Sequence, residues 1–161
     1  MPESIIARWK SAATNIGAAT RVALLLGTVA LAGAQPAAAD DQDVITYRQL
    51  IMKQLDAETE ALGMIVAGQI PPDSLASLAK AISYSAKAAG KAFESNVPGG
   101  EAKPEVWQKW ADFSKRMQAF GKKTEEMAKA SEGGNVATVT ELMVDALPCK
   151  QCHDQYRNKK K

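Results

Sequence analysis

The residues with the clearest chemical potential lie together near the C-terminus of this 161-residue chain, in the segment CKQCH at 149–153. Cys149, Cys152 and His153 are the only two cysteines and the only histidine of the chain. Two thiols and an imidazole at this spacing could form a redox-active pair, bind a metal ion or attach a haem group. On an α-helix the three side chains fall within about a 100° arc, so they could act on one group.

The surrounding sequence separates these possibilities. A thioredoxin-like pair expects a strand–helix–strand context, which this sequence does not predict. A zinc site takes about four ligands, so two cysteines and one histidine would need an additional carboxylate. A disulfide across two intervening residues closes too small a loop to stabilise a fold appreciably. The motif therefore predicts one covalently attached haem c, bonded through Cys149 and Cys152, with His153 as the iron ligand.

The second axial position of the iron is left open by the sequence. A second histidine from the same chain is excluded, because His153 is the only one. Methionine, another weak ligand or an empty position remain. Periodicity does not choose among the methionines of the predicted domain, and methionines commonly fill gaps in a core. The candidates are Met52, Met64, Met117, Met127 and Met143.

Residues 1–39 have the three parts of a secretory signal peptide. A basic region with Arg8, Lys10 and Arg21 is followed by an apolar run at 22–34 and by three alanines at 37–39. The apolar run is shorter than the roughly 20 residues of a membrane-spanning helix. We expect cleavage after Ala39, a mature domain at 40–161 and a periplasmic location; the alternative is an uncleaved anchor.

The charge of the predicted mature domain argues against nucleic-acid binding. The whole chain has 20 basic and 18 acidic residues. Loss of the leader removes three basic residues and one acidic residue, which leaves 17 of each. A nucleic-acid-binding domain needs a clustered basic face, which a neutral domain of this kind does not indicate.

Beyond Asp40 the sequence predicts four amphipathic helices and no strand. They cover about 43–67, then from a cap at Asp73 or Ser74 to about 93, from Pro104 to about 132, and from a cap at Asn135 into the cysteine motif. Short links between such helices predict an all-α, antiparallel four-helix bundle. Pro148 lies inside the last predicted helix and lacks an N–H, so we expect helical hydrogen bonding to break near 144–149.

The haem motif at the end of this helical pattern resembles the class II c-type cytochromes, which comprise cytochrome c′ and the low-spin cytochrome c-556 type. The resemblance covers about 44–160. Three segments carry it: YRQLIMK at 47–53, KPEVW at 103–107 and CKQCHDQYR at 149–157.

The resemblance implies roles for three further residues. Met52, four positions after the arginine of the first helix, would face the distal side of the haem, where a methionine ligates the iron in c-556-like members. Arg48 would pair with a haem propionate, a charge-assisted contact. Arg157, one turn after His153, would flank the proximal face.

These observations together predict a periplasmic one-electron carrier of the c-556 type and not an enzyme. Its partners would be redox proteins, its contact with membranes only indirect, and its state a monomer or homodimer. The alternative is a cytochrome c′-like protein with five-coordinate haem that binds NO or CO.

Overall fold

Six α-helices and one short 3-10 helix form residues 40–159, the part of the chain that the computed structural model describes. Their bounds are Asp41–Val66 (α1), Pro72–Ser74 (η2), Leu75–Ala92 (α2), Glu105–Gln108 (α3), Trp110–Ser131 (α4), Val136–Ala146 (α5) and Cys149–Tyr156 (α6). The predicted signal peptide at 1–39 lies outside the described residues, so its cleavage stays a prediction. Within 40–159, no helix has the length and apolar character needed to cross a membrane.

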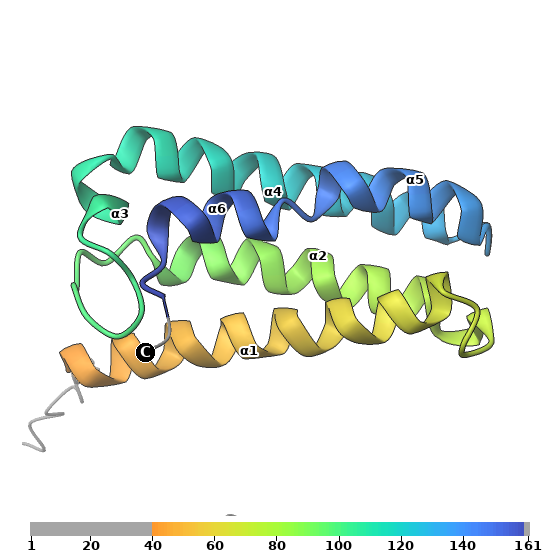
Figure 1. Ribbon diagram of the computed structural model, residues 1–161, viewed down its shortest axis with the longest axis horizontal. Helices are drawn as coiled ribbons and strands as arrows, with labels where there is room; N and C mark the ends of the chain where they lie inside the picture. Colours follow the sequence, from red (N-terminus) through yellow and green to blue (C-terminus); the bar gives the residue numbers. More distant parts are fainter. Residues whose placement is uncertain (1–39, 160–161) are drawn as a thin grey trace, which may run out of the picture. The chain divides into compact units, whose positions relative to one another are not determined.

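The long helices are arranged as a four-helix bundle, in which α5 and α6 together make the fourth member (Figure 1). Helix α2 packs against α1 and α4, and α4 packs against α5. The fully buried side chains of Leu62, Ile82, Met127 and Val139 come from these four neighbouring helices. The described residues contain no strand, only two isolated β-bridges. The predicted fold class is confirmed.

Two of the long helices begin with a side-chain cap. The carboxylate of Asp40 accepts a hydrogen bond from the backbone N–H of Asp43 at 2.8 Å. Asn135 caps α5 as predicted, because its side-chain oxygen accepts from the N–H of Thr138 at 3.1 Å. The cap predicted for the second helix was wrong. Ser74 occupies the N-cap position of α2 without a side-chain capping bond, since the 3-10 turn η2 leads the chain into the helix.

The third predicted helix is interrupted, which corrects the prediction of one continuous helix from Pro104. Lys109, with φ −116° and ψ 41°, separates α3 from α4. Helix α3 lies off the axis of α4 at one end of the bundle (Figure 1). It is held there by the buried side chain of Val106 and by the indole N–H of Trp107, which donates to the carbonyl of Phe93 at 3.2 Å.

The predicted break before the cysteine motif is confirmed. Helix α5 ends at Ala146, and α6 begins at Cys149. Leu147 and Pro148 between them have non-helical backbone angles, with ψ of 63° and 38°. Because proline has no N–H to donate to the preceding turn, the motif stands on a separate short helix.

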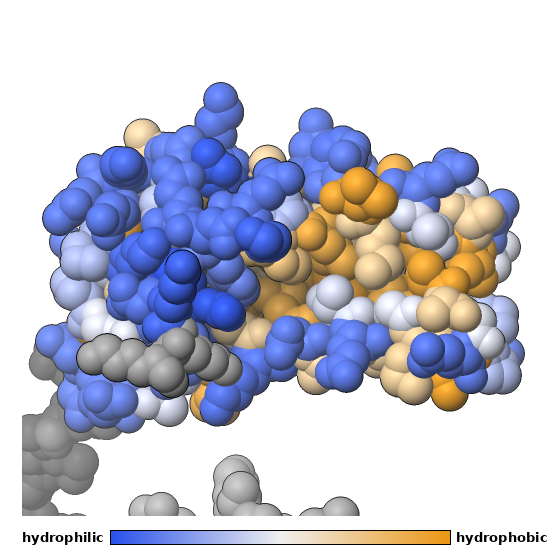
Figure 2. Space-filling model, viewed as in Figure 1, coloured by the Kyte–Doolittle hydropathy of each residue, from blue (hydrophilic) through white to orange (hydrophobic). Residues whose placement is uncertain are grey.

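The link between α2 and α3 is fixed on both of its sides. Gly99 has a φ of 137°, and a Cβ there would lie 2.6 Å from the Cδ1 atom of Ile45 on α1, so only glycine fits. On the other side, Ala102 forms an isolated antiparallel bridge with Arg157, just after α6. The link between α2 and α3 therefore contacts both α1 and the residue that follows α6. In Figure 2 the surface around α3 and α6 is strongly polar, while apolar surface gathers toward α5.

Candidate haem-binding site

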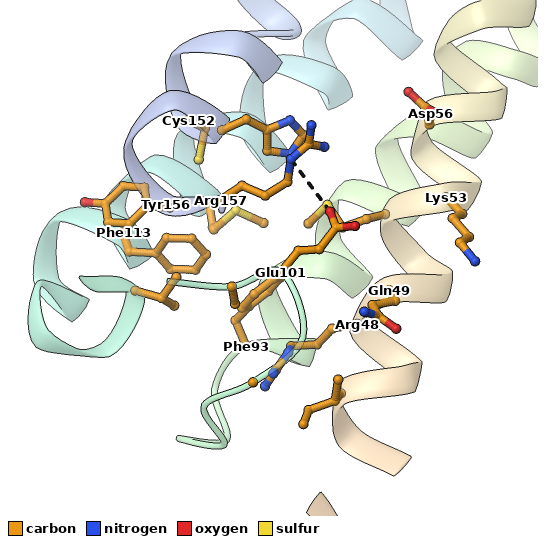
Figure 3. Close-up of a pocket in the computed structure, with 17 residues that line it drawn as sticks. Arg48, Gln49, Lys53, Asp56, Phe93, Glu101, Phe113, Cys152, Tyr156 and Arg157 are labelled. Carbon is orange, nitrogen blue, oxygen red and sulfur yellow. Dashed lines mark ion pairs between the residues drawn. The ribbon is translucent and has the colours of Figure 1, made fainter. Parts of the chain in front are cut away.

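A cavity of about 280 Å³ lies between α1, α4, α6 and the link that precedes α3 (Figure 3). Its walls bring together five of the six predicted site residues, which come from segments about 100 residues apart in sequence. They are Arg48, Met52, Cys152, His153 and Arg157. The sixth, Cys149, is exposed at the start of α6 and does not line this cavity.

Helix α6 presents the motif residues in forms suited to haem attachment. Cys149 and Cys152 are both free thiols, as thioether formation requires. Burial lowers the pKa of His153, and the nearby positive charge of Arg157 lowers it further. The imidazole is therefore more readily neutral, which is the form that offers a nitrogen lone pair to a metal.

Arg48 is a buried cation without a hydrogen-bond partner. The residue is only 3 % exposed, and neither its Nη1 nor its Nη2 atom has a hydrogen-bond partner within the described residues. The guanidinium carbon lies 5.3 Å from the ring centroid of Phe93 and 5.1 Å from that of Trp107. Such cation–π contacts contribute about 0.5–2 kcal/mol each, whereas burying an unpaired charge costs several kcal/mol.

The unpartnered guanidinium therefore calls for an anion in the cavity. A haem propionate has the required charge, and two oxygens that match the arginine fork. Phe93, Phe113 and Met52 supply apolar cavity walls suited to a macrocycle. Among residues 40–159, no three His, Cys, Asp or Glu side chains are grouped to hold a bare metal ion, so the zinc alternative has no ligand set. The residues of the cavity fit a haem group.

The structure reduces the five candidate methionines to two. Met52 lies one turn after Arg48 on α1 and lines the cavity half-buried, packed against apolar core on two sides. Met117 lines the same cavity from α4. The other three are placed elsewhere, with Met64 41 % exposed, Met127 fully buried in the core and Met143 packed against that core.

Arg157 is held at the cavity wall by a residue that sequence reasoning missed. Its Nε atom lies 3.8 Å from the Oε2 atom of Glu101, on the link before α3 (Figure 3). Both side chains are nearly half exposed, so the pair contributes little stability. No periodic signal could have revealed Glu101, because it lies in a loop more than 50 residues before its partner.

Tyr156 is a second missed residue of the cavity. It is buried, and its hydroxyl donates to the Oδ2 atom of Asp112 on α4 at 2.5 Å. Burial and the neighbouring carboxylate raise the pKa of Tyr156 to about 12. Its ring meets that of Phe113 edge-on, with centroids 5.1 Å apart. These contacts fasten α6 to the first turns of α4. The only sequence signal was an aromatic residue three positions after His153.

Comparison with known proteins identifies relatives across the described domain. The family model described as Cytochrome C′ matches residues 43–157. Cytochrome c′ of Alcaligenes xylosoxydans xylosoxydans is 28 % identical over 76 % of this chain and 98 % of that protein. Cytochrome c-556 of Agrobacterium fabrum is 29 % identical over 86 % of this chain and 93 % of that protein.

Solved structures of similar proteins share the bundle. A nitric oxide complex of a variant of cytochrome c prime from Alcaligenes xylosoxidans aligns with a TM-score of 0.70 and 27 % identity, over 75 % of this chain and 98 % of that one. A carbon monoxide-bound variant of the same protein aligns with the same TM-score, identity and coverage. The match of the family model, the bundle and the placement of the C-x-x-C-H motif agree, and the chain belongs to the cytochrome c′ family, whose members carry one covalently attached haem c per chain.

Proposed function

We propose that this protein is a cytochrome c′-like haem protein that binds small neutral gases such as NO or CO at a five-coordinate iron. The observation that carries the proposal is that the imidazole and the methionine of the cavity come from two different helices. Helices α6 and α1 lie on opposite sides of the cavity (Figure 3). His153, the only histidine of the chain, stands on α6, and the wall from α1 presents Met52, which is packed against apolar core on two sides. Because methionines commonly fill gaps in a core, we take Met52 as a packing residue that leaves the second axial position open.

When bound, haem supplies an iron that can take a diatomic ligand and carry one electron. The chain supplies the rest. Cys149 and Cys152 would hold the group covalently, and His153 would donate the proximal nitrogen. Arg48 would neutralise a propionate from a dry position. The apolar side chains of Met52 and Phe93 at the cavity would favour neutral diatomic molecules as ligands.

The relatives support this proposal. Variants of the cytochrome c prime of Alcaligenes xylosoxidans have been solved with nitric oxide and with carbon monoxide bound. Each of these alignments covers 98 % of the relative's chain and 75 % of this one.

A second candidate function is one-electron transfer by a low-spin haem with His153 and Met52 as axial ligands. Met52 favours it, because this thioether lines the cavity one turn from the buried Arg48. Two relatives named cytochrome c-556, 29 % and 26 % identical, also support it. Redox proteins would then be the partners.

We propose a periplasmic location for either function, from the predicted signal peptide at 1–39 and the covalent haem. We also propose a binding or carrier role rather than an enzymatic one. The only histidine is used as the proximal ligand, which leaves no imidazole for the acid–base steps of a peroxidase.

Electron paramagnetic resonance of the purified ferric protein distinguishes the two candidates. An open sixth position gives a high-spin signal, because one axial nitrogen provides a weak ligand field. Coordination by Met52 gives a low-spin signal. A low-spin ferric protein at neutral pH would overturn the gas-binding proposal and favour electron transfer.

A further inference from the structure

The last turn of α6 is closed by a residue from a distant part of the chain. The final carbonyls of an α-helix have no partner inside the helix. The ammonium group of Lys103 donates to the carbonyl oxygen of Asp154 at 3.1 Å and, more weakly, to that of Gln155 at 3.4 Å. The backbone N–H of Lys103 donates to the carbonyl of Tyr156 at 2.9 Å. One lysine therefore satisfies three consecutive carbonyls at the end of the helix.

The backbone around Lys103 is prepared for this contact. Pro104 follows it and biases Lys103 to an extended conformation. Just before it, Ala102 forms an antiparallel bridge with Arg157, and the carbonyl of Glu101 accepts from the N–H of Asn158 at 2.8 Å. The lysine stem is half-buried between these segments. Two neighbours of Lys103 are therefore bonded to the residues that follow α6, and they place its ammonium group at the end of the helix.

The helix that receives this contact is short and separate. It has 8 residues and is cut off from α5 by Pro148. Isolated helices of this length are unstable in water, so its conformation depends on tertiary contacts. His153 lies in its last turn, the turn that Lys103 closes. A cation at a helix C-terminus also offsets the partial negative charge there.

We propose that Lys103 is a positioning residue for the iron ligand, holding the end of α6 so that the His153 imidazole keeps a fixed orientation in the cavity. The proposal rests on iron ligation by His153, as in the proposed function, but not on whether the iron binds a gas or a methionine. It differs from a surface ion pair such as Lys150 with Asp154, where both side chains are mostly exposed.

The test uses the haem-loaded protein and three variants. Lys103→Met keeps the length of the stem but removes the charge and the side-chain donors. Lys103→Arg keeps both. Lys122→Met, at an exposed position of α4, is the matched control for loss of one surface charge.

Amide hydrogen exchange, read by mass spectrometry, should be faster in Lys103→Met within α6 and the residues that follow it, on the order of tenfold, because local opening becomes easier. If the ferrous iron is five-coordinate, resonance Raman should also show a shifted or broadened iron–histidine stretch, whereas the exchange measurement applies to either ligation. Lys103→Arg and Lys122→Met should match the wild type in both measurements.

Unchanged exchange in α6 of Lys103→Met, or equal acceleration throughout the chain, would overturn the positioning role. If Lys103→Met does not yield folded protein, Lys103→Gln, which keeps an amide donor, provides the same comparison with a smaller expected effect. A low-spin spectrum of the wild type would reject gas binding and leave the exchange result intact, so the two proposals fail separately.

Discussion

Arg48 and Met52 lie one turn apart on α1 and both line the same cavity, but only the arginine is buried. Its guanidinium is held between two aromatic rings and has no hydrogen-bond acceptor in the described residues. The first turns of α1 therefore place a bare positive charge and a thioether side by side at the haem cavity.

Arg48→Met should weaken the haem-loaded protein, because a buried charge-assisted contact with a propionate is lost. We expect a fall of about 1.5–3 kcal/mol in the free energy of unfolding, measured by denaturant titration. The reduction potential should also fall, since removal of a nearby positive charge favours the ferric state. Arg48→Lys should lie between the wild type and Arg48→Met. A variant as stable as the wild type, with an unchanged potential, would show that the propionate is not the partner of Arg48.

Tyr156→Phe should destabilise the protein by about 1.5–3 kcal/mol at neutral pH, because a buried hydroxyl bonded to a carboxylate is removed. The exposed Tyr84 provides the control, and Tyr84→Phe should have almost no effect.

The contribution of Tyr156 should also depend on pH in a defined direction. Folding raises the pKa of this hydroxyl from 10.0 to about 12, so the folded state holds the proton more tightly. The added stability is fully present below pH 10 and is lost as the pH rises from 10 to 12. The stability gap between the wild type and Tyr156→Phe should therefore close over that range. The difference in the free energy of unfolding between the two proteins cancels the contribution of lysine titration. A difference that stays constant from pH 10 to 12 would contradict the raised pKa of Tyr156.

The two thiols should differ in importance. Cys152 lines the cavity, whereas Cys149 is exposed. Each single serine variant should retain one thioether bond, seen as a red-shifted pyridine haemochrome spectrum, because one vinyl group stays conjugated. Cys149→Ser should yield more haem-loaded protein than Cys152→Ser.

The double variant is the control for covalent attachment. Haem should be removed from it by acid–organic extraction, while the wild type should keep its haem through the same treatment. Extractable haem in the wild type would refute attachment through this motif.

Much of the framework could be predicted from local sequence. The motif at 149–153 specified the cofactor because three residue types at fixed spacing have few other uses. Asn135 and Pro148 gave correct predictions, since capping by a side chain and the absence of an N–H act within one turn.

Features that depend on tertiary contacts could not be predicted in the same way. The break at Lys109 was hidden because the apolar stripe through Trp107, Trp110 and Phe113 keeps helical spacing across it. The contacts of Lys103 and Tyr156 connect segments that lie 44–52 residues apart in sequence. The sequence was also consistent with an Arg48 side chain in solvent. Only the packing of the bundle shows that it is buried.

The most direct test of the gas-binding proposal is carbon monoxide binding to the reduced wild-type protein, followed optically. The proposal predicts that CO binds without displacing a protein ligand, with a rate that stays proportional to CO concentration. Met52→Ala should then change the rate through the size of the distal space but leave the unliganded spectrum high-spin. Met64→Ala, at an exposed position on the same helix, should behave as the wild type. A rate that saturates with CO concentration in the wild type, and becomes proportional to it only in Met52→Ala, would show that Met52 occupies the iron and would contradict the proposal.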